Sequence, residues 1–168
     1  GCVFQGGNTN LLNSNINDNV NGVYIGDSLG TNNGHGIISN TNMNHNSGWN
    51  IRLSNVEYGQ TIVGCHFYGT PTRNIEITDS YGISFDSCII DGNVSNVDTH
   101  SPKGVHIISN SLIEPDTNFT GQKIYLRSCF TRTDSQYQTS LYDDGTKVGI
   151  GGTMTPTANL EVIDSNQT

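Results

Sequence analysis

Two acidic residues, Asp91 and Glu114, are the first candidates for chemistry in this chain. They lie 23 residues apart (114 − 91), which is one period of an internal repeat. Stacked one repeat apart, their carboxyl groups would come within about 5 Å, the separation of a retaining glycosidase pair. Crowding would raise one of the two pKa values, as a general acid requires. The alternative is a surface charge ladder neutralised by Arg132, which could instead orient the pair or bind an acidic sugar.

A second set of residues could bind a ligand. Tyr24, Arg52 and Glu76 occupy the same outward position in successive alternating segments, and Asp98 is a weaker fourth member. A mixed aromatic and charged strip can hold a sugar chain, with Trp49 stacking on a sugar ring. The alternatives are structural, because Arg52 and Glu76 would also suit a cross-strand ion pair. Trp49 would then be packed against the loop before it.

An outward column of the repeat changes from polar to apolar along the chain. Its members are Asn15, Asn42, His66, Ile89, Leu112 and Phe130. Three stacked apolar side chains expose more apolar surface than a monomer usually tolerates. We therefore predict that Ile89, Leu112 and Phe130 face another subunit, the alternative being a C-terminal segment that folds back over them.

The histidines and cysteines form no metal-binding pattern. The five histidines fall in different positions of the repeat, and the chain has no Cys-x-x-Cys pair. Cys65, Cys88 and Cys129 share one position, which alternates with Ser and Thr, and Cys2 falls in the matching place. This pattern predicts small, buried, reduced thiols, and it leaves a bridge between Cys65 and Cys88 open. Neither a metal nor a cofactor is predicted.

The repeat that must position these residues has a period in the low twenties. The middle residues of its six copies are Ser14, Thr41, Cys65, Cys88, Ser111 and Cys129, spaced 27, 24, 23, 23 and 18 residues apart. A steady period of this length is typical of a solenoid. The residue before each middle one is Asn, Gly or Ser. Asn and Gly tolerate the left-handed backbone, which predicts a sharp bend there.

Each repeat carries a further alternating segment, at residues 23–25, 51–53 and 75–77, with 97–99 as a weaker fourth. Three strands per coil predict an all-β parallel helix of about six coils and three sheets over residues 1–132. We expect no long helix, because no segment has a 3.6-residue apolar period. Residues 1–4 look like the second half of a copy, so we expect the chain to start within a repeat of a longer protein.

Composition limits the core and the partners. The chain has 168 residues, of which 33% are hydrophobic, and a net charge of −8. A thin stacked core fits this composition, and disorder is the alternative. The acidic balance argues against nucleic acid or an anionic membrane surface as a partner. No apolar run approaches the ~20 residues of a membrane span.

From residue 133 to 168 the pattern changes to a different, β-rich module. Asp144-Gly145 predicts a hairpin turn, and Val148-Gly149-Ile150-Gly151 begins a passage that continues through Pro156 to Leu160-Glu161-Val162. This passage resembles the "VGIGT…P…A.LEV" segment near the C-terminus of phage tail fibres and spikes, although Gly152-Thr153-Met154 replaces a shorter link. The coils resemble the right-handed, single-stranded parallel β-helix of the pectate-lyase type, as in bacteriophage tailspikes and neck appendages.

The two resemblances imply a homotrimeric virion protein, in a tail or neck appendage, that acts outside the cell and binds host cell-surface polysaccharide. The subunit interface predicted at Ile89, Leu112 and Phe130 would then be a trimer interface. In such fibres the C-terminal passage commonly precedes a self-cleaving chaperone domain. One alternative function is a polysaccharide hydrolase that uses Asp91 and Glu114. Another is a secreted bacterial polysaccharide lyase or epimerase. Lyases of this fold often use calcium with clustered Asp and Lys or Arg, and the scarcity of lysine counts against them.

Overall fold

The chain forms a parallel β-solenoid of about four turns. The structure, a computed structural model, describes residues 1–26, 33–57, 59–69, 73–97, 104–121, 124–133, 136–143 and 148–150, with side chains up to residue 131 except those of 33 and 34. All regular structure in these ranges is β-strand, as the apolar periodicity predicts. Within them, no helix is long and apolar enough to cross a membrane.

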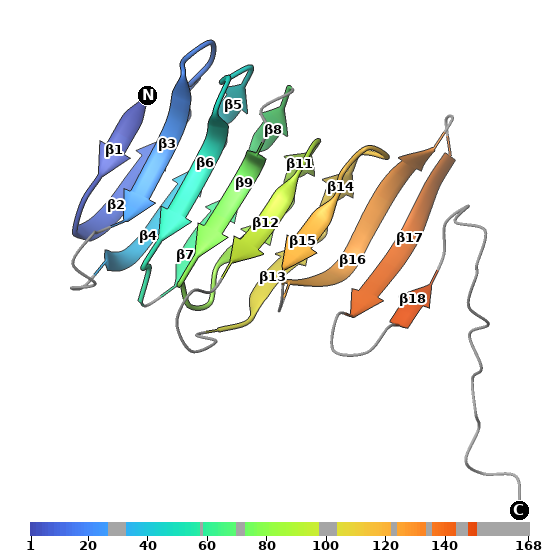
Figure 1. Ribbon diagram of the computed structural model, residues 1–168. Coiled ribbons are helices and arrows are strands. Elements are labelled where there is room, and N and C mark those ends of the chain that lie inside the picture. The colour runs from blue at the N-terminus through green and yellow to red at the C-terminus, as the bar shows by residue number, and fades with distance from the viewer. Residues whose placement is uncertain are drawn as a thin grey trace, which may run out of the picture.

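Three ladders of parallel strands run along the solenoid (Figure 1). Ladder A contains β1 (Cys2–Phe4), β3 (Asn21–Gly26), β6 (Trp49–Ser54), β9 (Arg73–Thr78), β12 (Val94–Val97) and β15 (Phe119–Gly121). Ladder B contains β2 (Gly7–Leu12), β4 (Asn33–Ser39), β7 (Gln60–Val63), β10 (Ser84–Asp86), β13 (His106–Ser109) and the first half of β16 (Ile124–Thr133). Ladder C contains β5 (Asn42–Asn44), β8 (His66–Tyr68), β11 (Ile89–Ile90), β14 (Leu112–Ile113) and the second half of β16.

Four turns have a separate strand in every ladder, from β3-β4-β5 to β12-β13-β14. At one end β1 and β2 have no strand in ladder C, and at the other end β15 is followed by β16, a single strand that serves both ladders B and C. The structure thus has about four turns, and the prediction of about six coils was too high. The three predicted ladders are present, but they make two sheets rather than three. Ladders B and C are joined because β16 runs without a break through the last bend and pairs with both β13 and β14.

The bend between ladders B and C is the most regular feature of the chain. Its six residues all have a left-handed backbone, with φ between 47° and 62°: Asn13, Asn40, Gly64, Ser87, Asn110 and Ser128. The small residue that follows each of them turns inward, and five of these six residues are buried. The predicted bend is therefore confirmed in every copy of the repeat.

The core is a narrow stack of equivalent side chains. In ladder B, Ile38, Ile62, Phe85 and Ile108 pair in sequence along neighbouring strands, and all are buried. Met43, Phe67, Ile90 and Ile113 form the matching buried row of ladder C. The rings of Phe67 and Phe85 meet edge to face, 5.9 Å apart, and connect the two rows. Each turn buries its apolar face only against its neighbours, as in other solenoids.

Two details of the predicted register are wrong. The segment predicted at 97–99 corresponds to β12, where Val94 pairs with Ile75 and Asn96 with Ile77, so the apolar alternation was sought three residues too late. Asn96 is buried in the place of an isoleucine and hides the apolar pattern. Cys2 pairs with Val23 in ladder A, so it does not share the bend position of the other cysteines.

The last described strands change direction. β17 (Gln136–Asp143) pairs antiparallel with β16, and β18 (Val148–Ile150) pairs antiparallel with β17 on either side of the predicted Asp144-Gly145 turn. The turn itself lies outside the described residues. β17 lies beside β16 as a further strand of the same sheet, so within the described residues it does not fold back over ladder C.

Candidate functional site

The outward face of ladder A carries a group of aromatic and charged side chains, called here the arginine–aromatic strip: Tyr24, Trp49, Arg52, Arg73 and Glu76. Tyr24 pairs in register with Arg52, and Arg52 pairs with Glu76. Trp49 pairs with Arg73 in the neighbouring row. Equivalent residues of neighbouring strands lie about 4.8 Å apart along the ladder, so five side chains from three strands share one patch.

The two rows lie side by side because β6 and β9 each carry two consecutive inward residues directly after their first residue. In β6 these are Asn50 and Ile51, and in β9 they are Asn74 and Ile75, all fully buried. Strict alternation would place Trp49 and Arg52 on opposite faces of the strand. The paired inward residues restore both side chains to the outer face, as they do for Arg73 and Glu76.

A buried asparagine ladder holds this start of ladder A. Asn46 donates through Nδ2 to Asn50 Oδ1 at 2.6 Å, and Asn50 donates through Nδ2 to Asn74 Oδ1 at 2.6 Å. Asn50 also donates to the carbonyl of Tyr68 at 3.1 Å, and Asn74 donates to the carbonyl of Asp91. Sequence reasoning missed this ladder. Its signal is an Asn before the first apolar residue of the strand, at Asn50, Asn74, Asn93 and Asn118.

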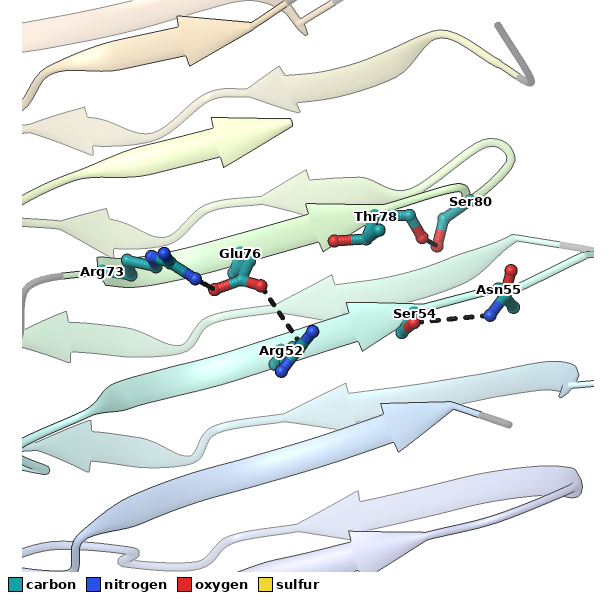
Figure 2. A network of polar contacts seen from close by, with 7 residues as sticks. All are labelled: Arg52, Ser54, Asn55, Arg73, Glu76, Thr78 and Ser80. Atoms are coloured by element: carbon teal, nitrogen blue, oxygen red, sulfur yellow. Dashed lines mark hydrogen bonds and ion pairs between the residues drawn. The ribbon is translucent and has the colours of Figure 1, made fainter. Parts of the chain in front are cut away.

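Glu76 is the centre of the charged part of the strip (Figure 2). Its Oε1 lies 3.2 Å from Arg52 Nε, and its Oε2 lies 2.7 Å from Arg73 Nη1. The side chain of Glu76 is 6% exposed, whereas those of Arg52 and Arg73 are 39% and 58% exposed. The hydrogen bond to Glu76, with the carboxylate charge, raises the pKa of Arg73 above its usual value. The predicted Arg52–Glu76 ion pair is present, and Arg73 is a partner that the prediction missed.

Trp49 is half-buried rather than freely exposed. Its ring is tilted by 49° against that of Tyr24, with the two centroids 6.3 Å apart. The two aromatic rings therefore support each other at one end of the strip. Asp98, the predicted fourth member of the outward column, lies outside the described residues. Ser95 occupies its place, because Ser95 pairs with Glu76.

Ladder C carries the predicted polar-to-apolar column in the expected register. Asn42 pairs with His66, His66 with Ile89, Ile89 with Leu112, and Leu112 with Phe130. Ile89 and Leu112 are half-buried, and Phe130 is 42% exposed. Ile89, Leu112 and Phe130 are called here the apolar column. Their place at a trimer interface stays a prediction.

The predicted catalytic carboxylates lie just beyond the apolar column. Asp91 and Glu114 follow the paired residues Ile90 and Ile113, so they stand on neighbouring turns. Burial raises the pKa of Asp91, the negative charge of Asp116 raises it further, and His66 lowers it. Asp116 is therefore an acidic neighbour of Asp91 that sequence reasoning did not select. A catalytic pair of Asp91 and Glu114 stays a prediction.

His66 connects the carboxylates with an aromatic group. Burial lowers the pKa of His66, while the charges of Asp91 and Glu114 raise it. The ring of His66 lies 5.8 Å from that of Tyr68, and the ring of His45 meets Tyr68 edge-on at 5.4 Å. The backbone of Arg132 pairs with Tyr137 in β17, but its side chain lies outside the described residues. Its proposed role beside the carboxylates stays a prediction.

Among the described residues, no group of three or more His, Cys, Asp or Glu is arranged to hold a metal ion. Cys65, Cys88 and Cys129 are free and buried. No protein-family model, curated protein or solved structure matches this chain. The candidate functions therefore depend on the geometry of the two outward surfaces.

Proposed function

We propose that this chain is part of a homotrimeric bacteriophage tailspike or appendage that binds host cell-surface polysaccharide. The protein would stand on the virion and act outside the cell. The parallel solenoid supports this proposal at the level of fold, and fold alone does not specify function. The arrangement of the outward surfaces supports it more directly.

The observation that carries the proposal is the arginine–aromatic strip. Sugar rings present apolar faces that stack on aromatic side chains and hydroxyl groups that accept hydrogen bonds from guanidinium groups. Trp49 and Tyr24 supply the first kind of contact, and Arg52 and Arg73 supply the second. The five side chains stand on hydrogen-bonded parallel strands, which limits the entropy lost on binding.

The apolar column supports the oligomeric part of the proposal. It lies on ladder C, away from the strip on ladder A, so one face can contact other copies while another face binds the ligand. The β17–β18 hairpin extends the sheet edge instead of covering the column. A second and a third copy of this chain would remove the exposed ring of Phe130 from water.

Glycan binding is tested with an array of bacterial surface polysaccharides. We expect the wild-type chain to bind a subset of them and Trp49→Ala to lose this binding. Tyr125→Ala, which removes a half-buried aromatic ring from ladder B, is the matched control and keeps it. Binding that survives Trp49→Ala unchanged would remove the strip as the binding surface.

The trimer is tested by light scattering on the full chain. We expect Leu112→Lys to give monomers, because it places a charge within the apolar column. Ile107→Lys is the control, since Ile107 is 41% exposed on ladder B and should leave the trimer intact. A wild-type chain that is monomeric at micromolar concentration would exclude the oligomeric part of the proposal.

A polysaccharide hydrolase is the second candidate, and the raised pKa of Asp91 favours it. A general acid must hold its proton near neutral pH, and burial beside Asp116 works in that direction. The test measures reducing ends released from a polysaccharide that the wild-type chain binds. Asp91→Asn and Glu114→Gln should each abolish release if the pair is catalytic, while Asp116→Asn should only shift the pH profile. Unchanged release in the first two variants would eliminate the pair.

A further inference from the structure

The strip concentrates positive charge on a chain that is otherwise acidic. The whole chain has a net charge of −8. Of the three Arg and Lys side chains that the structure describes, Arg52 and Arg73 flank a single carboxylate and Arg127 lies on ladder B. The trio of Arg52, Arg73 and Glu76 has a net charge of +1. Because the rest of the chain is acidic and repels anions, an anionic group of a ligand needs a local excess of positive charge such as this one.

Glu76 leaves most of the hydrogen-bonding capacity of the two arginines available. A guanidinium has five N–H donors, and Arg73 uses Nη1 for Glu76. Arg52 faces Glu76 through Nε at 3.2 Å, without the geometry of a hydrogen bond. Glu76 is almost fully buried, so it holds both guanidinium groups from beneath while their outer edges face water. Glu76 thus acts as a positioning residue for two partly exposed cations.

The register sets where an anionic group would lie. Arg52 and Arg73 stand on neighbouring strands, three residues out of register, and both guanidinium groups reach the single carboxylate of Glu76. One carboxylate or phosphate of a ligand can therefore contact both. Trp49 is the cross-strand neighbour of Arg73, and Tyr24 is that of Arg52. A sugar ring on the aromatic pair therefore places its substituent beside the arginine pair.

We propose that the arginine–aromatic strip binds an acidic glycan, with an anionic substituent held between Arg52 and Arg73 and the adjacent sugar ring on Trp49 and Tyr24. This inference rests on the proposed glycan-binding function and adds the charge of the ligand. Carboxylate and phosphate share the required chemistry, since guanidinium binds both in a bidentate manner.

The test compares three dextrans of one chain length: unmodified, carboxymethylated and phosphorylated. Affinity is measured for the full chain by its retardation in gels that contain each polymer. We expect at least one charged dextran to bind about 10-fold more tightly than unmodified dextran, as one charge-assisted contact allows. The charged dextran that binds more tightly identifies the anionic group. This preference should weaken as salt is added.

Three variants locate the effect. Arg73→Gln should lose about 10-fold in affinity for the preferred charged dextran. Arg73→Lys should recover part of it, because charge remains but the planar fork is lost. Arg127→Gln removes the same charge from ladder B and should bind like the wild type. Thermal unfolding of each variant checks that the fold is retained, which the exposure of Arg73 favours.

The inference is overturned if the wild type binds all three dextrans equally or binds none. Equal losses in Arg73→Gln and Arg127→Gln would also overturn it, since they would show dependence on overall charge. Binding to neutral array glycans alone would remove the acidic ligand and leave the proposed function standing. A chain that binds no glycan on the array and no dextran would remove both.

Discussion

The cysteines illustrate how position within the repeat controls the chemistry of a residue. Cys65 and Cys88 lie one turn apart at the inward position after the bend, and Cys129 occupies the same position in the last turn. Each sulfur contacts a backbone carbonyl of the preceding turn, as Cys129 does with Ile108 at 3.2 Å. Burial raises the pKa of Cys65 and Cys129, and it raises that of Cys88 to about 12.

These thiols should be inert in the folded chain. Because the thiolate is the reactive form, the thiolate population of Cys88 near pH 8 is about a thousandfold smaller than that of an ordinary cysteine. We expect Ellman's reagent to modify Cys2, which is half-buried, and to spare the other three until denaturant is added. Cys2→Ser should then show no rapid reaction, and rapid labelling of Cys88 would contradict its burial.

Two aspartates should change stability with pH in opposite directions. The pKa of Asp91 is raised by burial, so its contribution to stability is fully present below the unfolded pKa and is lost as the pH rises through the folded value. Asp86 accepts hydrogen bonds from Ser109, Asn110 and Ser87, which lower its pKa. Its contribution is present above the unfolded pKa and is lost as the pH falls through the folded value.

The contributions of the two aspartates to stability are separated by measuring the melting temperatures of Asp91→Asn, Asp86→Asn and the wild type near pH 7 and near pH 3.5. Asp91→Asn should raise the melting temperature near neutral pH and lose this gain in acid. Asp86→Asn should lower it near neutral pH, with a smaller loss in acid. Since Asp86 is only half-buried, its effect should be small and should weaken with salt. If Asp91→Asn changes the melting temperature equally at both pH values, the pKa of Asp91 is not raised by folding.

At the level of elements, the sequence identified the bends and the apolar rows but not the start of ladder A. Bends were predictable because Asn, Gly and Ser precede one small residue at a regular interval, and each proved left-handed. The apolar rows of ladders B and C were also predictable, because their residues recur at the same regular interval. The asparagine ladder was not, since sequence patterns assign Asn to loops and turns, whereas Asn50 and Asn74 are fully buried here.

The strip was predictable only in part. Tyr24, Arg52 and Glu76 follow strict alternation and were placed correctly in one outward column. Arg73 and Trp49 joined them because two inward residues interrupt the alternation, and apolar periodicity cannot reveal an inward Asn. An inward Asn also displaced the segment predicted at 97–99, because Asn96 takes an apolar position in β12. Inward Asn residues are thus where apolar periodicity fails in this chain.

The asparagine ladder should contribute measurably to stability. Asn50→Ala removes hydrogen bonds to Asn74 and Tyr68 and leaves Asn46 without its 2.6 Å acceptor. Buried groups that lose a partner cost about 1–3 kcal/mol. Asn15→Ala is the control, because it removes a single exposed hydrogen bond to Asn42 and should cost within about 0.5 kcal/mol. Urea unfolding measures both, and equal losses would contradict a special role for the buried ladder.

At the scale of the whole molecule, a solenoid must protect the edges of its terminal turns. A strand edge with unpaired N–H and C=O groups is a template for pairing with another chain. Here β17 pairs antiparallel with β16 and follows it past the bend through a register shift between Leu126 and Cys129. Ser128, with φ of 52°, lies within that shift. β17 and β18 therefore cap the last parallel turn of the sheet.

Removing the cap should make the chain associate through its exposed edge. A chain that ends at Thr133 leaves the ten-residue strand β16 without the partner that spans residues 136–143. A chain that ends at Ile150 keeps β17 and β18 and is the matched control. We expect sedimentation to show large, heterogeneous aggregates for the shorter chain and a single species for the longer one. If the shorter chain is equally soluble and monodisperse, β17 is not needed to protect the edge. Any association of the solenoid would then depend on side-chain surfaces such as the apolar column.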